Sequence, residues 1–329
     1  MAVGIGVGLG RFPFETGRQY FDWVRYCEDA GIDSIWQTDR LVSKEPNLET
    51  LATMAAIAGA TSKIRFGMNV ASIALRDPLI TAKQCATIDR LSDGRLLPAF
   101  GIGSALSRDY LATGKPTKAR GKRADEALTL VSRLWREDEV SFDGEFFSYD
   151  RASISPKPAN ANIPLWIGGG SKAAIERTAR IGTGWLAGID TPSHTATVVA
   201  GIREATARLG RTIDDDHYGA TFSYRFGSVD DPIAQQSIKG YSARLDGDPM
   251  DLLAIGDDAV ISKRIEEFLA AGCSKFVLIP IADGADDVMA QTEQLAEAVL
   301  PRFEGLSTPT PRRPAFSPPS PGRMTRWPR

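Results

Sequence analysis

The feature that most constrains the fold is an alternation that runs through the first 300 residues of this sequence. Apolar runs of strand length are followed by amphipathic stretches of helix length. In residues 18–30, for example, Tyr20, Trp23, Val24 and Cys27 fall on one helical face. Eight strands are read in this way, at residues 3–7, 32–37, 64–71, 95–101, 165–167, 185–187, 218–226 and 276–279. The alternation predicts an α/β fold, and eight such units predict a (β/α)8 TIM barrel.

A doubly wound open sheet is the alternative, because it alternates strands and helices in the same manner. Its dinucleotide fingerprint, G-x-G-x-x-G, would lie in the turn between the first strand and the first helix. Gly4, Gly6, Gly8 and Gly10 instead recur at every second position within the first strand. They therefore share one face of that strand, where they let another group approach closely or make the barrel thinner.

Insertions and a tail interrupt the regular pattern. Residues 140–149, centred on Asp143-Gly144, alternate and turn as a β-hairpin does, and residues 228–258 read as a loop-rich stretch. Residues 305–329 contain seven prolines, five arginines and no acidic residue, which predicts a disordered C-terminal tail. We therefore expect a barrel domain with insertion loops over residues 1–304 and a separate tail over 305–329.

Charge and cysteine content limit the partners. The chain has 39 Lys and Arg against 41 Asp and Glu, so neither a nucleic-acid footprint nor a polybasic membrane patch is expected. Cys27, Cys85 and Cys273 are far apart and lack the spacing of a zinc site. We expect no metal site, a cytoplasmic location and a small-molecule partner rather than nucleic acid or a membrane.

In a TIM barrel the chemistry lies at the carboxyl ends of the strands. Two such ends are rich in glycine: Gly168-Gly169-Gly170 leads directly into a helix at Ser171, and Gly103, Ser104 and Ala105 follow the fourth strand. Glycines let main-chain N–H groups converge on an anion, and a helix N-terminus adds a favourable dipole. An ordinary tight turn or helix cap is the alternative interpretation of each.

Asp39 is the most informative polar residue, because it follows the second strand directly. An acid there is a candidate for orienting a ring or moving a proton, and an ion pair with Arg40 is the alternative. Arg40 itself cannot be a general acid near neutral pH, although it can hold an anion or stabilise an oxyanion. The two histidines, His194 and His217, are placed away from the carboxyl ends. Proton transfer would then fall to Asp39, to Tyr110 or to water.

Several segments, taken in order, look familiar. They are Ala86 to Arg95 (ATIDRLSDGR) running on to Gly101-Ile102-Gly103-Ser104, Asp39, residues 134–147 (LWREDEVSFDGEFF), residues 163–169 (IPLWIGG) and Trp185. Together they cover about residues 1–300 and resemble the luciferase-like monooxygenase family. That family includes flavin-dependent monooxygenases and reductases that use the deazaflavin coenzyme F420.

The resemblance implies a barrel that carries a flavin or deazaflavin ring in its mouth, often in a homodimer. It implies that the two glycine-rich ends, Gly168 to Ser171 and Gly103 to Ala105, bind the phosphorylated part of the cofactor. It also implies that Asn69, Val70 and Ala71 form a bulge with an unusual peptide that presses on one ring face, a plain strand end being the alternative.

The choice of cofactor depends on Thr38-Asp39-Arg40-Leu41. This segment is closer to the Asp-His-Leu of the deazaflavin members than to the Glu-His-His of the luciferases, although Arg40 departs from both. We therefore expect an oxidoreductase that transfers a hydride between reduced F420 and a small organic substrate. The alternatives are an FMNH₂-dependent monooxygenase that uses O₂ and a catalytically silent flavin-binding partner subunit.

Overall fold

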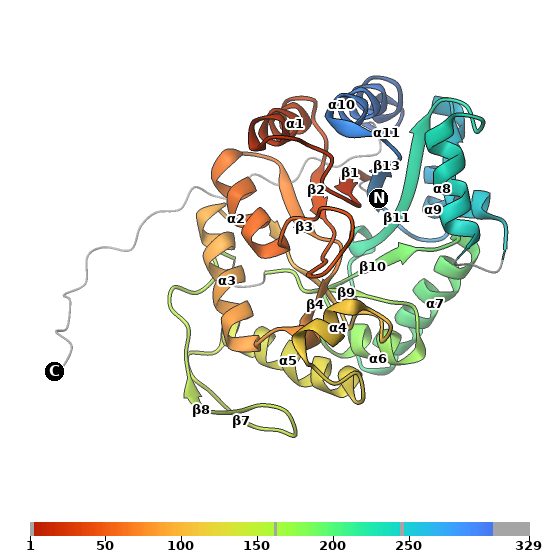
Figure 1. The fold of residues 1–329 in the computed structure, drawn as a ribbon. Coiled ribbons are helices and arrows are strands. Elements are labelled where there is room, and N and C mark those ends of the chain that lie inside the picture. The colour runs from red at the N-terminus through yellow and green to blue at the C-terminus, as the bar shows by residue number, and fades with distance from the viewer. Residues whose placement is uncertain (1–2, 161–162, 244–246, 305–329) are drawn as a thin grey trace.

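The computed structural model describes residues 3–160, 163–243 and 247–304, so the expected tail, 305–329, lies outside the described residues. The core is a curled parallel sheet with eight strand positions around the barrel, which we call staves. Two of the staves are each broken into two short strands. The staves are β1 (Gly4–Leu9), β2 (Ser34–Gln37), β3 (Arg65–Met68) with β4 (Ala71–Ser72), β5 (Leu96–Leu97) with β6 (Ala99–Gly101), β9 (Trp166–Gly168), β10 (Gly184–Ile189), β11 (Tyr218–Phe226) and β13 (Lys275–Pro280). Each stave pairs with the next, and β13 pairs with β1, which closes the barrel and confirms the predicted TIM-barrel fold (Figure 1).

A helix follows each stave and covers the outside of the sheet (Figure 1). These helices are α1 (Gly17–Asp29), α2 (Thr50–Ala60), α3 (Pro78–Leu91), α5 (Arg120–Arg136), α6 (Lys172–Ile181), α7 (Pro192–Arg208), α9 (Asp258–Ala270) and α10 (Gly284–Gln294), the last continuing through a π-helical turn (Leu295–Val299) into α11 (Leu300–Phe303). Local sequence sets their starts. Asp77 caps α3 by accepting a hydrogen bond from the Ile80 N–H, and Pro78 occupies its first turn.

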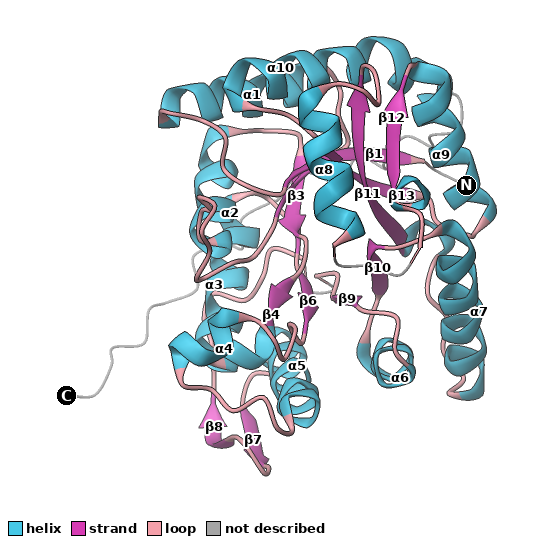
Figure 2. Cartoon of the chain, turned by 45° about the vertical axis from the view of Figure 1, so that its right-hand side comes forward, coloured by secondary structure: helices cyan, strands magenta, loops and turns pink. Residues whose placement is uncertain are grey.

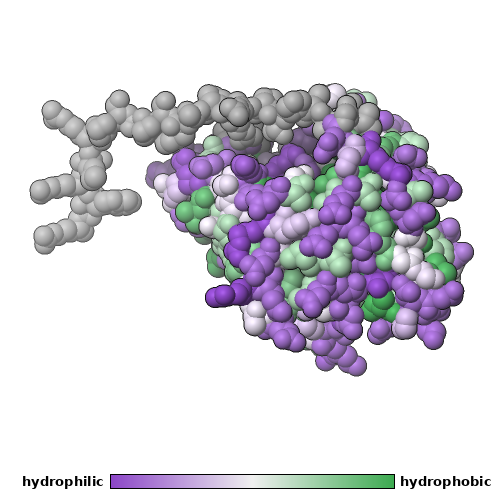
Figure 3. All heavy atoms as spheres, turned by 90° about the horizontal axis from the view of Figure 1, so that it is seen from above, coloured by the Kyte–Doolittle hydropathy of each residue, from purple (hydrophilic) through white to green (hydrophobic). Residues whose placement is uncertain are grey.

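The remaining elements are insertions. The predicted hairpin is present as β7 (Val140–Asp143) and β8 (Ser148–Ala152), and the short helix α4 (Arg108–Thr113) follows the fourth stave. Within the described part of the chain, no helix is long and apolar enough to cross a membrane. The face that carries α1 and α10 is mostly hydrophilic, with small hydrophobic patches between the polar side chains (Figure 3).

The prediction that residues 228–258 are loop-rich is wrong, because this stretch contains helix α8 (Pro232–Ser242) and strand β12 (Leu253–Gly256). Ala234 of α8 is fully buried, and Ile238 and Tyr241 follow it at helical spacing and pack against the same cluster, so a short apolar stripe does mark this helix in the sequence. β12 pairs in parallel with the last four residues of β11 (Figure 2). β13 pairs with the opposite edge of β11. β10 and β12 therefore share one edge of β11: β10 pairs with its amino-terminal part and β12 with its carboxyl-terminal part.

Two strands that read as continuous are interrupted. The peptide bond that joins Asn69 and Val70, between β3 and β4, is cis. Pro98 separates β5 from β6, as expected of a residue that has no N–H for the sheet, and its carbonyl accepts a hydrogen bond of 3.0 Å from the Trp166 N–H. The Asn69–Val70 interruption lies toward the carboxyl end of its stave, where the candidate site is expected, whereas Pro98 lies near the middle of its stave.

Two tryptophans lie in the barrel interior, together with Leu97, Ala99, Leu186 and Val277, and glycines on neighbouring strands make room for them. Trp36 and Trp166 meet edge to face, with ring centroids 6.3 Å apart. A Cβ on Gly67 would lie 2.6 Å from the Trp36 ring, and a Cβ on Gly184 would lie 2.7 Å from the Trp166 ring. On β1, a Cβ at Gly6 would lie 2.4 Å from the Ser34 Oγ. Of the two interpretations of the glycines in the first strand, close approach of neighbouring staves is the one that the structure supports.

This packing predicts the effect of adding one methyl group. Gly67→Ala would place its Cβ 2.5 Å from the Leu97 carbonyl oxygen and against Trp36, so we expect a loss of about 1–3 kcal/mol in the free energy of unfolding. Gly240→Ala on α8 is the matched control, since no atom lies within 4 Å of the added Cβ. It should be neutral or stabilising by up to about 1 kcal/mol. Urea unfolding of both variants measures this, and equal stabilities would contradict the packing argument.

Candidate functional site

Val70 packs against the interior cluster of the barrel and joins three of the predicted segments. A Cβ on Gly101 would lie 2.8 Å from the Val70 Cγ2, and a Cβ on Gly168 would lie 2.9 Å from the same atom. The Val70 side chain therefore packs directly on the bare backbones of β6 and β9. Asn69 points to the other side of the barrel, where its Oδ1 accepts a hydrogen bond of 3.3 Å from the Thr221 hydroxyl on β11.

The carboxylate of Asp39 is buried and ion-paired, and its partner is Arg76 rather than Arg40. Arg76 donates to the Asp39 Oδ2 at 2.8 Å and to its Oδ1 at 2.7 Å, and the Ser72 N–H donates to Oδ2 at 2.9 Å. The two side chains are 3% and 11% exposed. Burial by itself lowers the pKa of Arg76, but the hydrogen bonds and charge of Asp39 outweigh it, so the pKa is raised. Arg40 is exposed and forms no ion pair with any residue that the structure describes.

Sequence reasoning missed Arg76 because the contact depends on a 3-10 turn. Residues Ile73–Leu75 form this turn directly after β4, and it carries Arg76 to the end of the neighbouring stave β2. Arg76 also pairs with Glu49, the cap of α2, at 3.3 Å. A bidentate guanidinium–carboxylate pair is geometrically specific, so it fixes the end of β2 relative to the end of β4. The arrangement suits a positioning residue better than a proton carrier.

Gly103 belongs to the same cluster. It has a φ of +67°, and a Cβ there would lie 2.8 Å from the Ser72 Oγ and 3.2 Å from the Tyr110 ring. The Tyr110 hydroxyl donates a hydrogen bond to the Ile102 carbonyl, and burial raises its pKa, so Tyr110 keeps its proton and is a poor acid. Ser72 thus links Asp39 to the rim after the fourth stave, whereas Ser104 and Ala105 lie exposed beyond it.

The second rim, Gly168 to Ser171, is held in place by a hydrogen bond from Trp185 of the neighbouring strand β10. The indole N–H of Trp185 donates to the Gly169 carbonyl at 2.9 Å, and Gly169 has a φ of +106°. Ser171 caps α6 by accepting from the Ala174 N–H at 3.3 Å, as expected of a helix N-cap. The first turn of α6 is exposed at residues 171–173, so this helix directs its N-terminal dipole toward solvent at the mouth.

His194 also lies on this rim, which corrects the expectation that both histidines are away from the carboxyl ends. Helix α7 begins only three residues after β10 ends, so its first turn stays at the mouth. The His194 Nδ1 lies 2.5 Å from the Asp190 Oδ2, and a Cβ on Gly170 would lie 3.1 Å from the His194 ring. The Asp190 contact orients the imidazole and leaves Nε2 on its other side. His217, in contrast, precedes β11 at the opposite end of the barrel.

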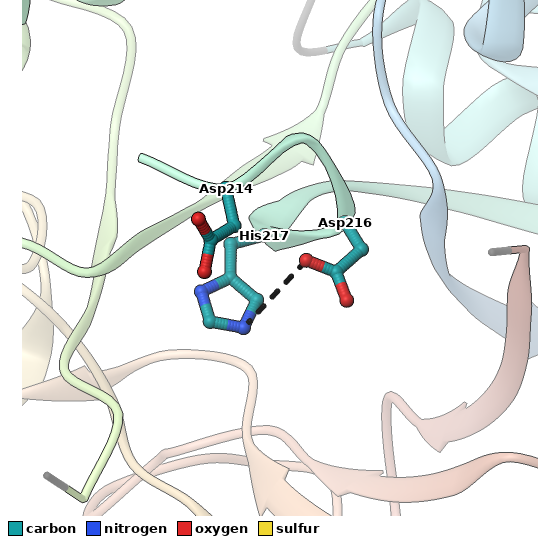
Figure 4. A group of neighbouring side chains, drawn as sticks. All are labelled: Asp214, Asp216 and His217. Atoms are coloured by element: carbon teal, nitrogen blue, oxygen red, sulfur yellow. Dashed lines mark ion pairs between the residues drawn. The ribbon is translucent and has the colours of Figure 1, made fainter. Parts of the chain in front are cut away.

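Among the residues that the structure describes, one group of possible metal ligands lies at that opposite end. Asp214, Asp216 and His217 bring their ligand atoms within 4.8 Å of one another (Figure 4). The Nδ1 of His217 is 2.8 Å from the Thr183 carbonyl oxygen, and its Nε2 faces Asp216 at 3.9 Å. Exposed carboxylates beside a histidine are common without an ion, and we assign this group no function.

The Asp39–Arg76 pair predicts a specific pattern of stabilities. Asp39→Ala would leave Arg76 nearly buried and short of its main partner, so we expect a loss of about 3 kcal/mol in the free energy of unfolding. The double variant Asp39→Ala/Arg76→Ala should lose less than the sum of the two single losses, because neither charge is then left alone. Arg40→Ala is the control, and it should change stability by no more than about 0.5 kcal/mol. Equal losses in Asp39→Ala and Arg40→Ala, measured by denaturant unfolding, would contradict the pairing.

Comparison with known proteins identifies several relatives of this chain. A chain of Mycobacterium tuberculosis, called an uncharacterized protein, is 30% identical over 202 residues, which cover 61% of this chain and 65% of that one. The match thus spans just under two thirds of that relative. The F420-dependent glucose-6-phosphate dehydrogenase of Amycolatopsis mediterranei is 25% identical over 323 residues, covering 88% of this chain and 95% of that enzyme.

Two solved structures share the fold. An F420-dependent secondary alcohol dehydrogenase, in complex with an F420–acetone adduct, superposes with a TM-score of 0.78 at 20% identity over 92% of this chain and all of that one. The FMN-bound oxygenating constituent of 3,6-diketocamphane monooxygenase from Pseudomonas putida gives 0.75 at 14% identity over 92% and 99%. The sequence pattern of the luciferase-like monooxygenases matches residues 5–264, so this chain belongs to the luciferase-like monooxygenase family.

Proposed function

We propose that this protein is an F420-dependent oxidoreductase that acts on a small organic substrate. The observation that carries the proposal is the cluster at the mouth, where Asp39, Val70, Gly103 and Gly168 come from four staves and are linked by direct contacts. When bound, a deazaflavin supplies hydride chemistry, and the protein supplies position, electrostatics and exclusion of water. The similarity to the F420-dependent dehydrogenases supports the choice of cofactor.

The residues of the mouth fit such a cofactor. Gly103 and Gly169 have positive φ values, and a Cβ on Gly103, Gly168 or Gly170 would lie within 3.1 Å of a neighbouring side chain. Backbone this bare lets N–H groups approach a phosphate, and the N-termini of α6 and α7 add favourable dipoles. We assign the anionic part of the cofactor to Gly168, Gly169, Gly170 and Ser171, and to Gly103, Ser104 and Ala105.

The ring would lie against Asn69, Val70 and Ala71. Val70 offers an apolar surface, and its contacts with Gly101 and Gly168 hold that surface in place. Asp39 acts here as a positioning residue, because its carboxylate fixes the Ser72 N–H and Arg76. Arg40, exposed at the same stave end, is placed to attract an anionic group of the cofactor or substrate.

An FMNH₂-dependent monooxygenase is the second candidate, since an FMN-bound monooxygenase shares the fold. A catalytically silent binding subunit would bind a cofactor but show no turnover.

We further propose a homodimer. The outward face of α2 is exposed at Ala52, Ala55, Ala56 and Gly59, and Ile80 on the neighbouring α3 is 60% exposed. A cytoplasmic location stays a prediction.

Separate titrations with F420 and FMN test the choice of cofactor. We expect F420 to bind with a micromolar Kd and FMN to bind at least about tenfold more weakly, a difference of about 1.4 kcal/mol. Ring fluorescence measures both affinities without requiring a substrate. Tight binding of FMN with no binding of F420 would reverse the assignment, and failure of both to bind would overturn the proposal.

The His194 rim position gives a second test. A hydrogen bond from His194 to an anionic group of the cofactor contributes about 1.5–3 kcal/mol, so His194→Ala should weaken binding by about tenfold or more. His217→Ala is the matched control, because His217 lies at the opposite end of the barrel, and it should leave the affinity unchanged. Fluorescence titration of both variants measures this. Equal affinities would remove His194 from the site.

A further inference from the structure

A groove of about 500 Å³ lies beside the mouth of the barrel. The ends of β11 and β12, the start of α9 and the π-helical turn after α10 line it. Three carboxylates, Asp257, Asp258 and Glu297, are among the lining residues, and no basic side chain lines it within the described chain. Phe226 and Ala298 add apolar surface. The groove therefore combines negative charge with a small apolar floor.

The carboxylates of this groove differ in what they already bind. Asp257 caps α9 by accepting from the Ala259 and Val260 N–H groups, both at 3.1 Å. Asp258 pairs with Arg302 of α11, whose guanidinium also lies 3.3 Å from the Ser262 hydroxyl. Glu297 is exposed and forms no ion pair with any residue in the described ranges. Asp258 thus already pairs with one arginine, which lies outside the groove lining, and Glu297 remains as a carboxylate that could pair with another.

The last described helix, α11, is tied to this groove by the ion pair between Arg302 and Asp258. Helix α11 ends at Phe303, one residue after the arginine that reaches Asp258, and residues 305–329 follow. This tail carries five arginines and no acidic residue, whereas residues 1–304 carry 34 basic and 41 acidic residues. Its 25 residues span up to about 80 Å when extended, which is far more than the groove requires.

We propose that residues 305–329 dock in the groove lined by Asp257, Asp258 and Glu297 of the same chain. Arginine side chains bind carboxylates in a bidentate manner, and proline limits the entropy that the tail loses when it is ordered. Attachment beside the groove gives the tail an effective concentration of the order of millimolar. Weak ion pairs therefore suffice, and the docking is sensitive to salt because exposed charges are screened.

Trp327 in the tail provides the measurement. The other five tryptophans, at positions 23, 36, 135, 166 and 185, are all 3% exposed or less, so acrylamide quenching reports chiefly on Trp327. Subtracting the Trp327→Phe variant isolates its signal. In the full-length protein we expect Trp327 to be protected in 10 mM salt and its quenching constant to rise about twofold in 1 M salt, because the Debye length falls from about 30 Å to 3 Å.

Charge reversal distinguishes this groove from other acidic surfaces. Glu297→Lys should remove the protection in 10 mM salt, whereas Glu204→Lys on α7, an exposed residue outside the groove, should keep it. Three results would overturn the proposal. They are quenching equal to that of the free 305–329 peptide, protection that survives Glu297→Lys, and protection that falls on dilution, which would assign the tail to a second copy of the chain.

Discussion

The absence of a Cβ at Gly6, Gly67 and Gly184 is the constraint on which the rest of this structure depends. Eight staves enclose little space, and Trp36 and Trp166 pack there edge to face in one cluster with Leu97, Ala99, Leu186 and Val277. Their rings fit because Gly67 and Gly184 present bare backbone to them. A close-packed interior of this kind has few alternative arrangements, so it fixes the positions of the stave ends and, through them, the geometry of the mouth.

Glycines also make room for neighbouring side chains at the mouth, where they connect the ends of adjacent staves. Gly101 and Gly168 leave room for Val70, and Gly103 leaves room for Ser72 and Tyr110. These contacts connect the ends of neighbouring staves, and the buried Asp39–Arg76 pair connects one more. The result is a rim of bare backbone and helix N-termini around an apolar centre. Such a rim would suit both the phosphorylated group and the ring of the cofactor that we propose.

The insertion after β11 changes one side of this rim. β12 takes the edge of β11 that β10 occupies lower down, so the sheet gains a strand only near its carboxyl end. The ends of β11 and β12, together with α9 and the helical turns that precede α11, then enclose an acidic groove next to the point where the described chain ends. The mouth and the groove are therefore separate features that depend on the same strand, β11.

The sequence by itself determined the architecture, the helix starts and the segments that form the rim. These features have local signals in the sequence: the alternation of apolar runs, the Asp77-Pro78 start of α3 and the hairpin turn at Asp143-Gly144. A local signal can be recognised without knowing which distant residues it will contact. Helix α8 was not predicted although Ala234, Ile238 and Tyr241 form a short apolar stripe, and strand β12 has only four residues, which are too few to show a period.

Only the tertiary structure decided which side chains meet. Asp39 finds Arg76 rather than its neighbour Arg40, because a turn of 3-10 helix brings a residue 37 positions away to the end of the next stave. His194 reaches the rim beside Gly170 for a similar reason, since the start of α7 stays at the mouth. Contacts of this kind depend on the closure of the barrel, and closure is a property of all eight staves together.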